Sequence, residues 1–178
     1  MIEVWFEPHA ETVDKVANRA SGWNDVPLSE LGRQQAVDLV ERYRGRGLAA
    51  IRCSDLQRAV LTAVPTAREL HLPIYPDVRL RECDYGDMTG RPGRMTSEER
   101  LEHITKPFPG GESYTQCMQR MKTFFDELKR LFDDKSVLIV GHMATHCGIE
   151  YLGLGKPLED CILERRSPQL GWRYELPS

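Results

Sequence analysis

The sequence lacks several features that would place a protein in a special class. Its apolar stretches fall well short of the ~20 residues that a membrane span needs. The formal net charge of −3 is too small to attract nucleic acid by its long-range field. The five cysteines are odd in number and form no Cys-x-x-Cys pair, which argues against a disulfide framework and a four-cysteine zinc site. The sequence therefore predicts neither a membrane nor a nucleic-acid partner.

The beginning of the chain also lacks the character of a signal peptide, because Glu3, Glu7 and His9 interrupt its apolar residues. Cysteines without a disulfide pattern are typical of a reducing compartment, so we predict a cytoplasmic location. A chain of 178 residues that is 40% hydrophobic and 29% charged fits a single globular domain over residues 1–178.

Short apolar runs alternate with helical patterns along the chain. Strands are predicted at residues 2–6, 48–53, 72–75, 137–140 and 172–176. Helices are predicted from the N-cap Ser29 to Gly45, from Ser54 to Ala67, and at about 97–104, 113–132 and 144–152. We expect a kink or a break at Pro65, and an edge position for strand 72–75 because Pro73 cannot donate to a ladder. The alternation predicts an α/β fold, a three-layer sandwich whose mostly parallel central sheet has helices on both faces.

Residues 84–111 are rich in glycine, proline and charge, and we expect them to form an excursion over the active site. Its basic side chains could meet an anionic substrate or could equally face water; they are Arg91, Arg94, His103 and Lys106. The run Glu98-Glu99-Arg100 is predicted to be a solvated helix face.

Four polar residues lie at the ends of predicted elements, at positions that do not contribute to a hydrophobic core. His9 and His142 each follow a strand, Arg58 lies in the first turn of a helix, and Glu82 lies in a loop. Such a set suits a phosphomonoester. The arginine fork fits phosphate oxygens, one imidazole can attack phosphorus, and a carboxylic acid can protonate the leaving alkoxide. With enough cationic donors, no metal is required.

Each of these residues also has an ordinary interpretation. His9 alone would be a loop or capping histidine, Arg58 an exposed helix residue and Lys15 a solvated lysine. Asp84 or Asp87 could replace Glu82 as the acid. His142 and His146 have a spacing that can bind metal on a helix. Because Met143 stands where a metalloprotease has glutamate, we predict no metal and expect His146 to be packed or near the rim.

The order of the motifs resembles that of the histidine phosphatase superfamily, also called the phosphoglycerate mutase-like family. The family pattern opens with Arg-His-Gly-Glu-Thr, and His9, Glu11 and Thr12 match it. The later matches run from Gly22 to Ala36, from Ser54 to Ala63, from Leu80 to Gly86, from Phe108 to Ser113 and from Val137 to His142. The resemblance covers the chain from residue 4 to about residue 150.

The resemblance implies a role for each catalytic candidate. His9 would become phosphorylated, Arg58 and His142 would clamp the phosphate, and Glu82 would donate the proton. No cofactor is implied. At 178 residues the chain is similar in length to the short phosphatases of the family rather than to the longer mutases. Further phosphate- or substrate-binding residues are predicted at Thr12, Lys15, Ser21, Gly22 and Met143.

Near the nucleophile the chain departs from the family pattern. Pro8 replaces the first arginine, Ala10 replaces the following glycine, and Lys15 stands where the family has asparagine. Met143-Ala144 replaces the usual pair of glycines. Loss of one preorganised donor typically costs about 10²–10³ in rate. We hypothesise that Lys15, or alternatively Arg19, partly restores the missing charge.

The sequence thus predicts a metal-independent phosphatase that hydrolyses a small phosphorylated metabolite through a phosphohistidine on His9. Two alternatives remain open. Pro8 and Ala10 favour a catalytically weak phosphate-binding or regulatory member of the fold, and the family also contains phosphoglycerate mutase-type phosphotransferases. A homodimer is also left open, and Trp5, Met88 and Met95 are expected to be exposed.

Overall fold

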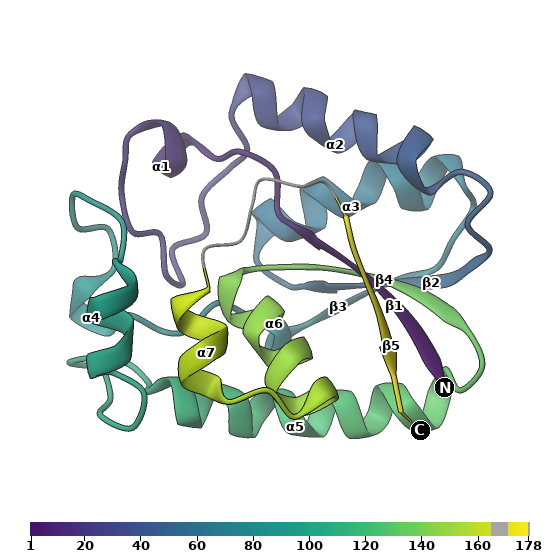
Figure 1. The fold of residues 1–178 in the computed structure, drawn as a ribbon. Coiled ribbons are helices and arrows are strands. Elements are labelled where there is room, and N and C mark those ends of the chain that lie inside the picture. The colour runs from purple at the N-terminus through teal and green to yellow at the C-terminus, as the bar shows by residue number, and fades with distance from the viewer. Residues whose placement is uncertain (165–170, 178) are drawn as a thin grey trace.

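A central five-stranded sheet organises the computed structural model, which describes residues 1–164 and 171–177 (Figure 1). The strand order is β3-β2-β4-β1-β5, and only β5 runs antiparallel to its neighbour. The strands are β1 (Ile2–Pro8), β2 (Leu48–Ser54), β3 (Ile74–Asp77), β4 (Ser136–Gly141) and β5 (Trp172–Leu176). Strand β4 lies in the middle, and its apolar run Val137–Val140 is fully buried, as expected for a parallel strand covered on both faces.

Helices cover both faces of the sheet, which confirms the predicted three-layer α/β architecture. Helices α2 (Glu30–Tyr43) and α3 (Gln57–Glu69) pack on one face. Helices α5 (Tyr114–Leu131), α6 (Met143–Gly148) and α7 (Leu158–Leu163) pack on the other, with a π-helical turn at Ile149–Gly153 between the last two. Figure 1 shows these two groups above and below the sheet.

The short elements gather at one end of the sheet, away from both chain termini (Figure 1). They include α1 (Val13–Val16) and α4 (Ser97–Glu102), together with two 3₁₀ turns at Val78–Leu80 and Gly86–Met88. This is the end where the parallel strands have their carboxyl termini, the place where open α/β sheets bind ligands. No helix within residues 1–164 and 171–177 has the length and apolar character to cross a bilayer.

Most predicted elements are present, with some shifted ends. Ser29 caps α2 by accepting a hydrogen bond from the Gly32 N–H, as predicted. The next helix begins at Gln57 rather than at Ser54, because Ser54 is the last residue of β2 and its hydroxyl accepts from the Leu56 N–H. Of the kink or break predicted at Pro65, the break does not occur. Helix α3 continues through it because proline removes a single hydrogen bond, whereas the whole buried face of the helix packs on the core.

Strand β3 lies at the sheet edge as predicted but spans residues 74–77 instead of 72–75. The expectation of exposed apolar residues was also wrong. Met95 is buried, whereas Trp5 and Met88 are half-buried and pack against the two core clusters.

Candidate active site

The two predicted strand-end histidines meet because their strands are neighbours. Strands β1 and β4 pair in parallel, with Pro8 opposite Gly141, and the His9 N–H donates to the Gly141 carbonyl at 2.8 Å. The ring centroids of His9 and His142 are consequently 5.2 Å apart. Gly141 is required here, since a Cβ atom at this position would lie 2.4 Å from the hydroxyl oxygen of Thr145.

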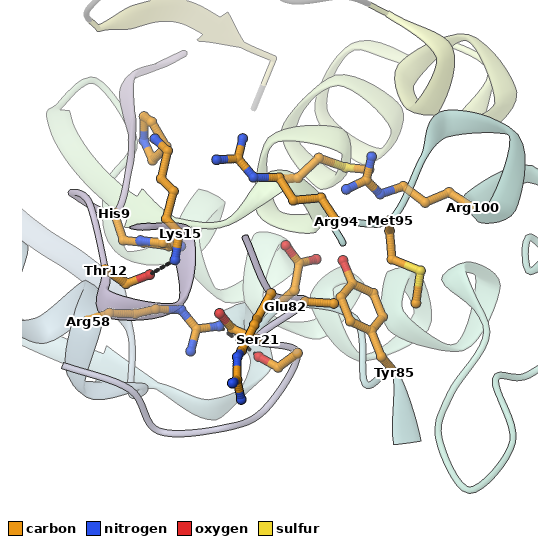
Figure 2. Close-up of a pocket in the computed structure, with 15 residues that line it drawn as sticks. His9, Thr12, Lys15, Ser21, Arg58, Glu82, Tyr85, Arg94, Met95 and Arg100 are labelled. Atoms are coloured by element: carbon orange, nitrogen blue, oxygen red, sulfur yellow. Dashed lines mark hydrogen bonds between the residues drawn. The ribbon is translucent and has the colours of Figure 1, made fainter. Parts of the chain in front are cut away.

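A cavity of about 260 Å³ opens beside His9 at the carboxyl end of the sheet. Figure 2 shows its polar lining, with the carboxylate of Glu82 drawn between His9 on one side and Tyr85 and Met95 on the other. The lining contains eight of the predicted site residues, namely His9, Thr12, Lys15, Ser21, Gly22, Arg58, Glu82 and Met143. His142 lies next to the His9 ring but is not itself among the lining residues.

The His9 imidazole is held in one tautomer. Its Nδ1 lies 2.8 Å from the carbonyl oxygen of Ala10, and a carbonyl can only accept, so Nδ1 carries the hydrogen and Nε2 keeps its lone pair. Burial, followed by the positive charge of Arg58 and, with a smaller effect, that of Lys15, lowers the pKa of His9 to about 3. His9 is therefore neutral at physiological pH, the form that a nucleophilic imidazole needs.

His142 is almost completely buried, and neither of its ring nitrogens has a hydrogen-bond partner among the described residues. Burial, together with the charges of Arg58, His9 and Arg120, holds the pKa of His142 well below its usual value. Buried polar atoms without partners are rare in folded proteins. Two orphan nitrogens beside His9 fit a site that is completed by the oxygens of a ligand.

Arg58 is 1% exposed and is oriented by the loop that precedes α2. Its Nη1 donates to the Asn24 carbonyl at 2.8 Å, and its Nη2 donates to the Gly22 carbonyl at 2.7 Å. Its Nε is buried without a partner in the described residues. The guanidinium is thus fixed by two hydrogen bonds and retains free N–H groups for an anion.

Glu82 is buried to 9% exposure and lines the cavity. One carboxylate oxygen, Oε1, accepts from the N–H of Cys83 at 2.8 Å and from that of Ala144 at 3.2 Å. Among the described residues that line the cavity, Glu82 is the only carboxylic acid. Asp84, the first alternative, instead accepts from the Gly86 N–H within its own turn.

The loop that carries His9 is pressed against the beginning of α2. The Ser29 N–H donates to the Glu11 carbonyl, and a Cβ atom on Gly32 would lie 1.9 Å from that same oxygen. On the other side, the Ala10 N–H donates to the hydroxyl of Thr62 on α3 at 2.9 Å. Thr12 caps α1 by accepting a hydrogen bond from the Lys15 N–H. This hydrogen bond fixes the backbone of Lys15, whose side chain lines the cavity.

Several of the predicted cationic side chains line the cavity, whereas others do not. Lys15 and Arg19 line it, and Arg94 is the one member of the predicted basic group from residues 84–111 that does so. Arg91 pairs with Glu99 at 2.6 Å, His103 stacks on Phe108, and Lys106 is exposed.

The expectation of a solvated helix face at residues 98–100 is wrong for Arg100, because this residue also lines the cavity. Helix α4 presents Glu99 toward Thr96 and Arg91 and turns the following arginine inward. Tyr85 and Met95 complete the lining from the same excursion, and no sequence pattern had marked either of them as a cavity residue.

His146 is packed, one of the two predicted outcomes. It is 3% exposed, its ring lies 4.5 Å from the Phe6 ring centroid, and its Nε2 contacts the Tyr174 hydroxyl. Within the described residues, one other group has metal-ligand character, Cys83, Glu112 and Cys117, with ligand atoms within 4.8 Å of one another. The Arg120 guanidinium already lies 2.6 Å from the Glu112 carboxylate and 3.2 Å from the Cys117 sulfur, so two of these three groups contact a cationic side chain.

Comparison with known proteins adds independent findings. The family model for the histidine phosphatase superfamily (branch 1) matches residues 4–163. The probable phosphoglycerate mutase GpmB of Yersinia pestis (strain Pestoides F) is 34% identical over 98% of this chain and 92% of its own length.

Among solved structures, a mycobacterial glucosyl-3-phosphoglycerate phosphatase in complex with VO3 is similar to this chain. It has a TM-score of 0.80 and 29% identity, over 90% of this chain and 85% of that one. The alpha-ribazole phosphatase from Shigella flexneri has a TM-score of 0.76 and 27% identity, over 89% of this chain and 83% of that one.

Proposed function

Because the chain belongs to the histidine phosphatase superfamily (branch 1), we propose that it is a metal-independent phosphatase of small phosphomonoesters. We also propose that residues 1–178 form a single domain that carries this activity. The observation that carries the proposal is the state of His9. Its Nδ1 hydrogen is held by the Ala10 carbonyl and its pKa is low, so an unprotonated Nε2 is available beside the buried Arg58.

In the proposed first step, His9 Nε2 attacks phosphorus and the bond from phosphorus to the ester oxygen breaks. The Arg58 N–H groups and the adjacent His142 would stabilise the charge on the phosphoryl oxygens. Glu82, protonated at that moment, gives its proton to the departing alkoxide and becomes a carboxylate. The product is a phosphohistidine whose Nδ1–H remains bonded to the Ala10 carbonyl.

In the second step, the Glu82 carboxylate takes a proton from water, and the oxygen of that water attacks phosphorus. The bond from Nε2 to phosphorus breaks, which returns neutral His9, protonated Glu82 and inorganic phosphate. Thr12, Ser21, Gly22 and Met143 would shape the phosphate site, since all four border the same cavity.

We infer that Lys15 supplies part of the positive charge that is missing at Pro8. Pro8 borders the cavity but offers no donor, whereas Lys15 lines the cavity and its charge contributes to the low pKa of His9. Lysine is a flexible point charge rather than a rigid fork, so the replacement is imperfect. Arg19, which also lines the cavity, is the second candidate for this role.

We also propose that the preferred substrate carries a second anionic group. Five cationic residues line the cavity, against the single carboxylic acid Glu82, and a phosphate dianion alone would not balance them. Arg94 and Arg100 come from the excursion, away from the Arg58 clamp. Two relatives act, by their names, on phosphorylated acids, and such compounds have the required pair of anions.

A panel of phosphorylated metabolites tests the proposed function, with release of inorganic phosphate as the readout and His9→Ala as the control. Turnover by the wild type that is lost in the variant supports it. Binding of phosphate without turnover would instead support the regulatory alternative that Pro8 and Ala10 favour. The mutase named among the relatives is a second candidate, and transfer of phosphate between two positions of phosphoglycerate would identify it.

A further inference from the structure

One tripeptide, Gly22-Trp23-Asn24, contacts both Arg58 and Glu82. The carbonyls on either side of Trp23 accept the two hydrogen bonds of the Arg58 guanidinium. The indole Nε1–H of Trp23 donates to the Glu82 carbonyl at 2.6 Å. The residue that would clamp phosphate and the residue that would donate the proton are therefore linked through one tripeptide, whose backbone holds Arg58 and whose indole holds Glu82.

Arg120 on α5 holds the same Glu82 carbonyl from another direction. Its Nη2 donates to this oxygen at 2.8 Å and to the Arg81 carbonyl at 2.9 Å, and its Nη1 donates to the Arg79 carbonyl at 2.6 Å. The Glu112 carboxylate anchors the guanidinium at 2.6 Å. Three carbonyls of the segment from Arg79 to Glu82 are thus bound to one guanidinium, whose carbon lies 5.8 Å from the Trp23 ring centroid.

The position of Trp23 is set by these polar and charged groups rather than by the apolar core. Trp23 is half-buried, and within the described residues it belongs to none of the three apolar clusters. The guanidinium carbon of Arg81 lies 4.8 Å from its ring centroid, on the loop that leads to Glu82. A large indole outside the core that donates to the backbone of a proton donor indicates a role at the site.

We propose that Trp23 is a positioning residue that fixes the carboxyl group of Glu82 relative to Arg58. Arg120 supports this role by donating to the same Glu82 carbonyl. The inference rests on the proposed phosphatase function. A general acid works only within hydrogen-bond reach of the leaving oxygen, and a displacement of about 1 Å can cost about 10²-fold in rate. Trp23 acts on Glu82 and leaves the charge of the phosphate clamp unchanged.

A comparison of two substrates with different leaving groups distinguishes a positioning role of Trp23 from a general structural role. An alkyl phosphate needs a proton on its departing oxygen, whereas 4-nitrophenolate departs readily without one. Trp23→Phe keeps an aromatic ring and removes the N–H donor. We expect kcat/KM for an alkyl phosphate such as glycerol 2-phosphate to fall by about 10-fold to 100-fold, and that for 4-nitrophenyl phosphate by less than about threefold.

The chain offers a matched control and a reference. Trp5 is also half-buried and its Nε1 donates to Glu3, far from the site, so Trp5→Phe should leave the ratio of the two kcat/KM values unchanged. Glu82→Gln, which removes the acid itself, should change the ratio in the same direction as Trp23→Phe and by more. Thermal unfolding of each variant tells whether the fold is retained.

An equal fall in both kcat/KM values for Trp23→Phe, or no change in either, would overturn the positioning role while leaving the phosphatase proposal intact. A wild-type protein that hydrolyses neither compound nor any phosphomonoester of the panel would overturn the proposed function, and this inference with it.

Discussion

At the residue scale, the state of His9 decides whether the chain can act as proposed. The sequence identified the residue through its motif and through the strand that precedes it. The protonated nitrogen could not be read there, because it depends on the Ala10 carbonyl, whose direction the backbone sets. The same holds for Arg58, whose two carbonyl acceptors come from a loop more than thirty residues earlier in the chain.

The low pKa of His9 predicts a loss of stability in acid. The folded-state pKa of about 3 lies below the ordinary value of 6.5, so as the pH falls below 6.5 the unfolded chain takes up this proton first. As the pH falls from 6.5 toward 3, the titration of His9 therefore lowers the free energy of unfolding by about 1.4 kcal/mol for each pH unit.

Urea denaturation of wild type and His9→Gln at pH 7 and pH 5 measures the effect. The wild type should lose about 2 kcal/mol more than the variant over this interval, because glutamine takes up no proton. Burial is the main cause of the low pKa of His142 and is present in both proteins, so most of its contribution cancels in the comparison. Equal losses would mean that the His9 pKa is not depressed in the folded state.

Lys15 provides a second prediction at this scale. Lys15→Ala should lower kcat/KM for 4-nitrophenyl phosphate by about 10-fold to 100-fold, since it removes the charge that we assign in place of the arginine missing at Pro8. Lys122→Ala on α5 is the control, because Lys122 is exposed and pairs with Asp126. If the two variants keep the same kcat/KM as wild type, Lys15 has no such role.

At the scale of elements, the beginning of α2 follows from a local signal, whereas the course of α3 and the direction of Arg100 depend on tertiary contacts. The Ser29 cap was predictable because its acceptor and donor lie three residues apart. Continuation of α3 through Pro65 was not, since the core cluster that holds the helix draws on strands far away in sequence. Arg100 was misassigned for a similar reason, because only the packing of the excursion turns it toward the cavity.

Gly32 tests the contact between α2 and the His9 loop. Gly32→Ala would place a Cβ atom against the Glu11 carbonyl, where 1.9 Å is available, so the loop must move. We expect the free energy of unfolding to fall by about 1–3 kcal/mol, together with a loss of kcat/KM. Val37→Ala on the same helix is the control, because Val37 is 52% exposed. A Gly32→Ala protein as stable and active as wild type would show that the contact is not needed.

At the scale of the whole molecule, the cavity depends on the hydrogen bonds that hold the 84–111 excursion against the rest of the chain. Two of its glycines donate to the loop before Trp23, Gly90 to the Ala20 carbonyl at 2.6 Å and Gly93 to the Asn18 carbonyl at 2.7 Å. These contacts bring Arg94 to the His9 side of the molecule, and the sequence alone gave no reason to choose it over Arg91.

The second-anion proposal belongs to this scale, and the excursion contains its own control. Arg94→Gln should raise the KM for a phosphorylated carboxylic acid such as 3-phosphoglycerate by about tenfold or more, because the variant loses one charge-assisted hydrogen bond to the second anion. The KM for 4-nitrophenyl phosphate, which has no second anion, should change little. Arg91→Gln should change neither value, because Arg91 is paired with Glu99 outside the cavity. Equal effects of Arg94→Gln on both substrates would exclude a second-anion site.

Phosphorylation of His9 during turnover is the step on which the proposed mechanism depends, and trapping the phosphoenzyme detects it. The protein is mixed with a radiolabelled phosphomonoester, denatured in alkali within the first turnovers, digested, and the labelled peptide is mapped. We expect an acid-labile, alkali-stable label on the peptide that contains His9, and none in His9→Ala. A wild-type protein that turns over without any such label, or a fully active His9→Ala variant, would contradict it.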